Sequence, residues 1–250
     1  MRKHQNYALF NGDKNTPVRD TYSCFKSFSR GYSSAMIFLA FEGLDGSGKS
    51  SLMRQLENHL VQKHIEFIHT REPGGTWLGD QLRQLILQKP EQNQQAPTAR
   101  TELLMYEASR AQHVDCVIQP ALKAGQWVLC DRFTASSLAF QASGRAISAE
   151  NVRWLNDFAT DFLKPHLNVL LDLSVQESRE RRQSRQQAVG LLEDRIEAEA
   201  DSFHQKVRES FLKQSDQNPT EWLVLNAAES PEKLFKQLLA ELKARKWLDS

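Results

Sequence analysis

The sequence predicts an α/β fold built on a five-stranded, mostly parallel sheet with helices on both faces. Short apolar runs alternate along the chain with longer segments of helical periodicity, which is the pattern of βαβ units. A glycine-rich motif also follows the first apolar run and opens a helical segment, as in open α/β sheets that bind nucleotides. At 250 residues the chain is long enough for one such domain to bury a sizeable core.

The expected strands are compact apolar runs bounded by turns. The first covers residues 37–42 and is apolar up to its last residue, which is typical of a strand buried on both faces. The other four expected strands are 67–70, 127–130, 168–172 and 222–226. The expected helices between and after them are 50–63, 79–87, 100–124, 150–162, 175–185, 193–215 and 231–246. The polar, Gln-rich stretch 89–97 predicts a surface loop.

The composition changes at Met36. Residues 1–35 lack a sustained apolar period and are expected to form a disordered N-terminal extension, whereas residues 36–250 form the expected folded domain. Six basic and two acidic residues give the extension a formal charge of +4, which leaves −3 for the domain. A weak organelle-targeting segment, or residues upstream of a true start at Met36, are the alternative interpretations of residues 1–35.

Charge and cysteine content exclude several classes of protein. A formal net charge of +1 argues against a protein that coats nucleic acid. No apolar run approaches the roughly 18 residues that cross a bilayer, so a membrane protein is not expected. The three cysteines form neither a CxxC pair nor a disulfide framework, which favours a reducing, cytoplasmic location.

The motif after the first strand is GLDGSGKS, which satisfies G-x-x-x-x-G-K-[ST]. Its glycines let backbone N–H groups surround phosphate oxygens, Lys49 reaches the β- and γ-phosphates, and Ser50 offers a hydroxyl to Mg²⁺. The predicted phosphate-binding residues are Gly43, Leu44, Asp45, Gly46, Ser47, Gly48, Lys49, Ser50 and Ser51. A magnesium-bound nucleoside triphosphate is therefore expected. The missing N-K-x-D tetrapeptide argues against a GTPase.

Asp131 and Arg132 follow the third expected strand. Ligands of open α/β sheets lie beyond the carboxyl ends of the strands, so both side chains are expected to face the phosphate-binding motif. Asp131 could hold magnesium directly or through water, and Arg132 could hold a phosphate through paired hydrogen bonds. A structural ion pair is the alternative.

An arginine cluster lies near the end of the expected helix 175–185. At 100° per residue Arg181, Arg182 and Arg185 fall within one 100° sector, and the polar stretch 186–192 predicts a flexible lid after them. Such cations could neutralise charge during phosphoryl transfer. A solvated helix face or a nucleic-acid patch are the alternatives, and the phosphate-binding motif upstream favours the lid.

From Met36 onward the chain resembles the thymidylate kinases of bacterial type. The matching stretches are FEGLDGSGKS (41–50), TREPGGT (70–76), LLMYEASRAQH (103–113), DRFTASSLAFQASGR (131–145) and LEDRIE (192–197). The resemblance implies the P-loop fold of nucleoside-monophosphate kinases with an Arg-rich lid, in a homodimer without nucleic-acid or membrane partners. It also implies phosphoryl transfer from ATP to dTMP, with Mg²⁺. A P-loop without a basic residue before Lys49, combined with arginines in the lid, matches the bacterial arrangement.

The resemblance implies a role for individual residues. Arg71 would contact the dTMP phosphate, Tyr106 would stack on thymine and Arg110 would bind its O4 oxygen. Phe140 stands next to the sugar where the family more often has Tyr, so a hydroxyl is missing there. The implied dTMP-binding residues are Arg71, Tyr106, Arg110, Arg132, Ser137, Phe140 and Gln141. The implied catalytic residues are Asp45, Lys49, Arg132, Arg182 and Arg185, with Ser50 and Asp131 as metal ligands.

Two other functions compete with this hypothesis. The first is a kinase of the same fold that phosphorylates another nucleoside monophosphate or small acceptor. The second is a P-loop module that regulates a partner and has no catalytic turnover.

Overall fold

The computed structural model describes residues 36–91, 93–190 and 193–248, so the extension expected at 1–35 lies outside the described residues. The strands are β1 (Phe38–Glu42), β2 (Phe67–Arg71), β3 (Trp127–Asp131), β4 (Leu167–Asp172) and β5 (Trp222–Asn226). The helices that flank them are α1 (Lys49–Gln62), α2 (Trp77–Leu87), α3 (Ala99–His113), α4 (Gln119–Lys123), α5 (Thr134–Ser137), α6 (Ala149–Thr160), α7 (Val175–Val189), α8 (Asp201–Gln217) and α9 (Pro231–Ala244). All five predicted strands are confirmed within one residue at either end.

The five strands form one sheet in the order β2-β3-β1-β4-β5, and every neighbouring pair is parallel. The prediction of a mostly parallel sheet is therefore confirmed, and all five strands are parallel. Asp131 at the end of β3 is in register with Phe41 of β1 and Arg71 of β2. The register places the carboxyl ends of these three strands side by side, where the functional residues were expected.

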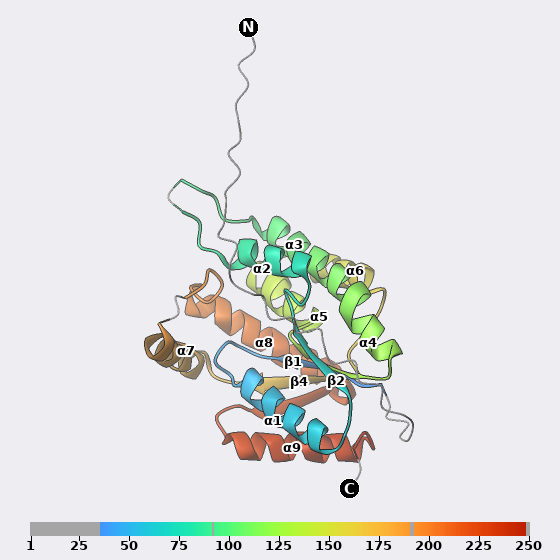
Figure 1. The fold of residues 1–250 in the computed structure, drawn as a ribbon. Coiled ribbons are helices and arrows are strands. Elements are labelled where there is room, and N and C mark those ends of the chain that lie inside the picture. Colours follow the sequence, from blue (N-terminus) through green and yellow to red (C-terminus); the bar gives the residue numbers. More distant parts are fainter. Residues whose placement is uncertain (1–35, 92, 191–192, 249–250) are drawn as a thin grey trace, which may run out of the picture. The chain divides into compact units, whose positions relative to one another are not determined.

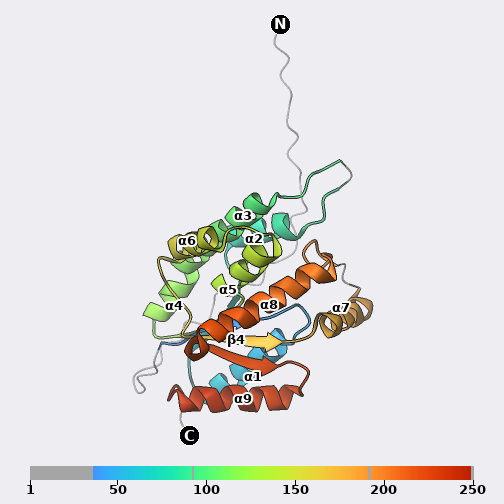
Figure 2. The ribbon, with the colours of Figure 1, turned by 180° about the vertical axis from the view of Figure 1, so that it is seen from behind.

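Helices cover both faces of the sheet (Figures 1 and 2). α1 and α9 contact each other on one face, and α4 and α8 pack on the other. In β1 the side chains alternate between the two layers, because Leu39 and Phe41 join the core under α1 and α9 while Phe38 and Ala40 join the opposite core. A strand that is apolar on both sides can only lie inside such a layered fold.

The helix expected at 193–215 begins only at Asp201. Residues 194–199 form turns because the Asp194 carboxylate accepts hydrogen bonds from the backbone N–H groups of Ile196 and Glu197, both at 2.8 Å. A short side chain that caps nearby backbone donors competes with the helix in this way. Upstream, α7 extends to Val189, so most of the lid expected at 186–192 is helical as far as it is described.

A helical stretch after β3 was not predicted from the sequence. α5 is followed directly by the π-helical segment η2 (Leu138–Gly144), and a second π-helical segment, η1 (Val114–Ile118), interrupts the helix expected at 100–124. π-Helical turns are frequently found at functional sites. η2 carries two of the predicted dTMP-binding residues, Phe140 and Gln141. None of the helices in the described ranges is long and apolar enough to cross a bilayer.

Candidate functional site

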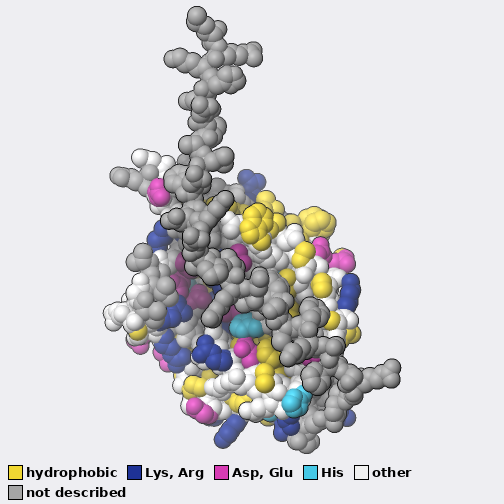
Figure 3. Space-filling model, viewed as in Figure 1, with side chains coloured by type: hydrophobic (Ala, Val, Ile, Leu, Met, Phe, Trp, Pro, Cys, Tyr) yellow, Lys and Arg dark blue, Asp and Glu magenta, His cyan; other side chains and the backbone are white. Residues whose placement is uncertain are grey.

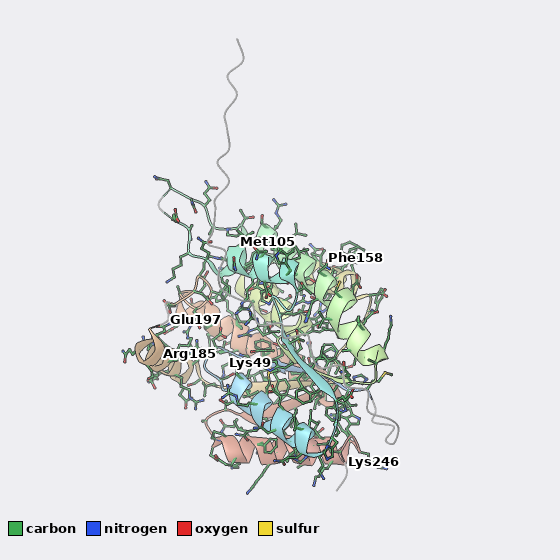
Figure 4. All side chains as sticks on the ribbon, viewed as in Figure 1. Lys49, Met105, Phe158, Arg185, Glu197 and Lys246 are labelled. Carbon is green, nitrogen blue, oxygen red and sulfur yellow. The ribbon has the colours of Figure 1, made fainter. Side chains whose placement is uncertain are left out.

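The phosphate-binding motif lies between β1 and α1, as predicted, and α1 begins at Lys49 (Figure 4). A side chain cannot replace Gly43, because its φ is +130° and a Cβ there would lie 2.5 Å from the Leu171 carbonyl oxygen. Ser50 and Ser51 occupy the first turn of α1 and are exposed. The loop therefore presents backbone N–H groups and hydroxyls at a helix N-terminus, which is a favourable site for a phosphate.

Lys49 lies among oxygen atoms at the carboxyl ends of β1 and β3. Its Nζ donates to the carbonyls of Gly43 and Leu44, both at 3.2 Å, and lies 3.9 Å from Asp45 and 4.0 Å from Asp131. Burial and the nearby Arg132 lower the pKa of Lys49, while the two aspartates oppose that shift. The ammonium group is therefore held beside two carboxylates at the mouth of the loop.

Arg132 joins the two halves of the site. Its Nη2 donates to Asp45 at 2.8 Å, and the guanidinium lies 5.0 Å from the centroid of the Phe140 ring. Burial alone would raise the pKa of Asp45, but Arg132 and Lys49 hold it well below its usual range. The charge on Asp45 is thus fixed by two cations, and the predicted residues Asp45, Lys49 and Arg132 form one cluster.

Glu42, at the end of β1, was not predicted as a site residue although it is fully buried. Its carboxylate accepts hydrogen bonds from the Phe133 N–H at 2.8 Å and from the Ser136 hydroxyl at 2.6 Å. These bonds anchor the turn in which Arg132 takes the left-handed backbone conformation, with φ at 71°. Burial raises the pKa of Glu42 to about 7, against the opposing effect of Arg132.

A pocket, partly open to solvent, lies beside Arg132. Of the implied dTMP-binding residues, all but one line it. The lining residues are Asp45, Glu72, Pro73, Arg83, Leu87, Tyr106, Arg110, Arg132, Phe133, Ser136, Ser137, Phe140, Gln141, Asp194 and Ile196. Arg71 is the exception, because its exposed side chain lies at the end of β2, 3.7 Å from Asp80.

Arg110 on α3 is the most enclosed cation of the pocket, at 1% exposure. Its partners are Glu72 Oε2 (2.7 Å), Glu107 Oε1 (2.7 Å), Asn156 Oδ1 (2.6 Å), Ser137 Oγ (2.9 Å) and the Phe133 carbonyl (3.2 Å). The two carboxylates raise the pKa of Arg110 against the effect of its burial. Within the described part of the chain, one N–H of Nη2 has no acceptor, so this group can still donate to a ligand.

Glu72 extends the network around Arg110 into the protein interior. Its second oxygen lies 3.0 Å from His113 Nδ1, and His113 Nε2 lies 2.6 Å from the Thr70 hydroxyl. Gly75 packs directly against this chain, because its φ is +76° and a Cβ there would lie 2.6 Å from the Thr70 hydroxyl. The TREPGGT turn is thereby locked onto α3, which carries Tyr106 and Arg110.

The arginines of α7 do not form the single cationic face that the sequence predicted. Arg182 is 4% exposed and donates to the Glu197 carbonyl at 2.7 Å, whereas Arg185 is half-exposed and donates to the Glu197 carboxylate at 2.8 Å. Arg181 donates instead to the Ala227 carbonyl after β5, at 3.0 Å. The helical angles place these residues on one side of α7, but their guanidinium groups point toward different acceptors. Figure 4 shows Arg185 and Glu197 close together beside α7.

The pocket offers few groups for a metal ion without a nucleotide. None of the described residues belongs to a cluster of three or more His, Cys, Asp or Glu side chains that could hold a metal. Asp131, however, has a buried Oδ1 without a hydrogen-bond partner in the described chain, and Ser50 lies at the start of α1. Mg²⁺ commonly takes one or two protein oxygens and completes its shell with phosphates and water. The predicted pair Ser50 and Asp131 fits that requirement.

Several site residues escaped the sequence analysis because their partners are distant in the chain. Arg83 donates to the Pro73 carbonyl at 3.2 Å and lines the pocket together with Asp194. Glu107 and Glu42 are buried acids within otherwise apolar or helical surroundings. The signal that could have identified them is a charged residue at a position that periodicity assigns to the core.

Comparisons with known proteins are consistent with this geometry. Residues 41–238 match the family model for thymidylate kinase. The thymidylate kinase of Bdellovibrio bacteriovorus is 63% identical over 213 residues, which cover 85% of this chain and 98% of that protein. The enzyme of Geotalea uraniireducens is 40% identical over 83% of this chain and 97% of its own length. The crystal structure of thymidylate kinase from Ehrlichia chaffeensis superposes with a TM-score of 0.65 at 26% identity, covering 83% of this chain and 99% of that one.

Proposed function

The chain belongs to the thymidylate kinase family and phosphorylates dTMP to dTDP with ATP as the donor, and from this premise we propose how its residues divide the work. The observation that carries the proposal is the pocket beside Arg132. It combines the aromatic rings of Tyr106 and Phe140, the guanidinium of Arg110 enclosed by its acceptors, and Arg132, which donates to Asp45 in the phosphate-binding loop. A nucleoside monophosphate has the three parts that such a pocket can bind: a base, a sugar and a phosphate.

The base is read on the α3 side of the pocket. The Tyr106 ring offers a stacking surface, and the unused N–H of Arg110 is available for the O4 oxygen of thymine. Ser137 and Gln141 also line the pocket and complete the contacts to the edge of the base. Gln141 is oriented by Glu102, to which its Nε2 donates at 3.0 Å. The O4 oxygen of a pyrimidine is therefore recognised by a single donor, the Arg110 guanidinium, which its protein partners already hold in place.

The sugar lies against Phe140, which packs on Phe203 and Phe211 and has no polar group to offer. A deoxyribose needs no partner at its 2′ carbon, so an apolar wall is compatible with it. The acceptor phosphate lies between Arg132 and Arg71, on the side of the pocket nearest Lys49. Arg71 reaches this position from its exposed place at the end of β2 by a change of side-chain rotamer.

The reaction is a direct in-line transfer without a covalent enzyme intermediate. A phosphate oxygen of dTMP attacks the γ-phosphorus of ATP while the bond to the β,γ-bridging oxygen breaks, and ADP leaves with that electron pair. The attacking oxygen is already ionised, so no general base is needed. Lys49, Arg182 and Arg185 neutralise the equatorial oxygens, and Asp45 orients Arg132 toward the acceptor. The backbone N–H groups of the loop, residues 43–51, hold the ATP phosphates.

Ser50 and Asp131 are the residues that hold Mg²⁺ with the nucleotide. The ion would offset negative charge on the β- and γ-phosphates and align them. Asp131 is suited to this role because its Oδ1 has no hydrogen-bond partner among the described residues and lies 4.0 Å from Lys49 Nζ.

The enzyme works as a homodimer through the face formed by α2, α3 and α6, which contact one another in sequence. These helices and the turn after α6 expose large apolar side chains: Trp77, Leu78, Leu85, Leu104, Trp154, Phe158 and Phe162. Figure 3 shows hydrophobic side chains gathered at the upper right of the coloured surface, in the region of α3 and α6. Trp154 and Phe158 stack with ring centroids 5.9 Å apart. Contiguous apolar patches of this kind mark protein interfaces.

Light scattering coupled to size-exclusion chromatography tests the dimer. The described domain should elute at twice the mass of one chain, and Phe158→Glu should shift it to the monomer. A wild-type monomer at micromolar concentration contradicts this assignment.

Since free Cys116 and Cys130 and the need for ATP suit a reducing compartment, we place the enzyme in the cytoplasm, with no nucleic-acid or membrane partner.

A panel of nucleoside monophosphates tests the acceptor assignment. With ATP and Mg²⁺, kcat/KM should be highest for dTMP, lower for dUMP and at least 100-fold lower for CMP and GMP. A preference for CMP or GMP would contradict the role given to Arg110. If uridine and thymidine ribonucleotides are accepted as well as dTMP, the apolar wall at Phe140 does not discriminate at the sugar.

A further inference from the structure

Glu102, in the first turn of α3, is a buried carboxylate that the mechanism above does not use directly. It is 1% exposed, and three donors from distant parts of the chain converge on it. Its Oε1 accepts from Gln141 at 3.0 Å and from Arg145 at 3.2 Å, and its Oε2 accepts from Arg195 at 2.6 Å. Burial alone would raise the pKa of Glu102, but these hydrogen bonds lower it, so the group is ionised at neutral pH.

The three donors come from the two sides of the active site. Gln141 belongs to η2 and lines the dTMP pocket, whereas Arg195 belongs to residues 194–199, which we call the lid anchor. Arg195 also donates to the Ile86 carbonyl at 2.8 Å, so the lid anchor is fastened to the end of α2 as well. Glu102 is therefore the group that the acceptor pocket and the lid anchor share.

The lid anchor in turn holds the arginines of α7. Glu197 accepts from Arg182 through its carbonyl and from Arg185 through its carboxylate, at 2.7 and 2.8 Å. The anchor is internally tied as well, because Asp194 accepts from the Glu197 N–H at 2.8 Å. Figure 4 shows Arg185 and Glu197 adjacent to each other, at the side of the molecule where α7 lies. Hydrogen bonds and the short backbone segment of the lid anchor thus connect the base pocket to the lid arginines.

We propose that Glu102 is a positioning residue that holds the lid anchor, and through it the guanidinium groups of Arg182 and Arg185, in register with bound dTMP. The proposal rests on the proposed function, since it needs an acceptor beside Gln141 and a donor beside the lid. Misplacement of a charge-stabilising group by about 1 Å can cost on the order of 100-fold in rate. Loss of Glu102 should therefore act mainly on kcat.

The first test is the steady-state kinetics of Glu102→Gln, which keeps the size of the side chain and removes its charge. We expect kcat to fall between 10- and 100-fold, and KM for dTMP to rise a few-fold because Gln141 is less well oriented. Glu241→Gln is the control, because Glu241 is also paired with an arginine, Arg245, but belongs to α9 and to neither the acceptor pocket nor the lid anchor. The control should keep kcat within threefold. A change confined to KM for dTMP would overturn the proposal.

The second test is a double-mutant cycle between Glu102→Gln and Arg185→Gln, two residues that do not touch. If Glu102 positions Arg185 through the lid anchor, the loss of kcat from Arg185→Gln should be at least fivefold smaller in the Glu102→Gln background. Multiplicative losses would overturn the proposal, because a role limited to folding or to Gln141 predicts them. Should Glu102→Gln fail to fold, Arg195→Gln takes its place in the cycle with the same expectation.

Wild-type turnover separates this proposal from the proposed function. An enzyme that fails to phosphorylate dTMP contradicts the function itself. An enzyme that phosphorylates dTMP normally while the two substitutions act independently contradicts only the role of Glu102.

Discussion

The acceptor pocket and the lid hold their arginines in opposite ways. Arg110 is 1% exposed and lies between the carboxylates of Glu72 and Glu107, whereas Arg185 is half-exposed and pairs with Glu197 alone. A buried cation is tolerated only when its partners repay the loss of hydration. The pocket therefore holds its cation in place through protein carboxylates, whereas in the lid Arg182 is buried and Arg185 stays close to water. We infer that the acceptor nucleotide binds to a site that is already formed. The Arg185 guanidinium, in contrast, is brought from solvent to the donor phosphates.

Lys49 lies between the two regions, and its removal should have the largest effect. Lys49→Met should reduce kcat at least 1000-fold, because the Lys49 ammonium group lies at the mouth of the phosphate-binding loop beside both Asp45 and Asp131. Coupled detection of ADP release measures the loss. Circular dichroism should show an intact fold, and normal turnover in this variant would overturn the phosphate-binding assignment.

The contrast in burial predicts different effects on stability. Arg110→Met should lower the free energy of unfolding by about 3–5 kcal/mol, because the buried carboxylates of Glu72 and Glu107 lose the cation that they share. Arg185→Met is the matched control and should cost less than about 1 kcal/mol, since its ion pair is partly exposed and screened. Urea unfolding at pH 7 measures both values. Equal losses would remove the distinction between the two regions.

Glu42 adds a pH dependence to the acceptor side. Its pKa rises from the ordinary value of 4.5 to about 7 in the folded protein, so the folded state binds the extra proton between these values. Stability should therefore fall as the pH rises from 5 to 8, by about 3 kcal/mol from this group. Glu42→Gln should remove that part of the slope. Parallel pH profiles of wild type and variant, measured by urea unfolding, would contradict the prediction.

A lid substitution should change rate more than acceptor affinity. Arg185→Gln should lower kcat between 10- and 100-fold, because one transition-state cation is lost, with KM for dTMP within threefold of wild type. Initial rates at saturating ATP provide both constants. If KM for dTMP rises as much as kcat falls, Arg185 belongs to the acceptor site and not to the lid.

The sequence predicted the parts of this molecule whose signals are local. β1 through β5 are continuous apolar runs, and the phosphate-binding loop needs glycines at fixed spacing, so both could be located without any long-range information. The π-helical segment η2 could not, because it is short, ends in Ser and Gly, and packs against α5, α6 and α8, which are contacts that a local pattern does not show. The late start of α8 was missed for a similar reason, since the Asp194 cap competes with a helical pattern.

The sequence singled out the residues that are expected to contact the nucleotides. It did not single out the buried carboxylates that hold those residues in place. Glu42, Glu102 and Glu107 act through partners that lie elsewhere in the fold, such as Arg195, which is 93 positions beyond Glu102. Nothing local to a buried glutamate shows which cation will meet it. For the arginines of α7, the helical spacing could be predicted from the sequence. The direction of each guanidinium could not, because it depends on acceptors in other parts of the fold.

The most direct test of the preorganised acceptor pocket is calorimetric titration of dTMP without ATP. Wild type and Arg185→Gln should bind dTMP with Kd values within threefold of each other. Arg110→Lys keeps the charge between Glu72 and Glu107 but loses the planar fork of donors, so its Kd should be at least 30-fold weaker. An Arg185→Gln variant that loses as much affinity as Arg110→Lys, or an Arg110→Lys variant that binds like wild type, would contradict the account.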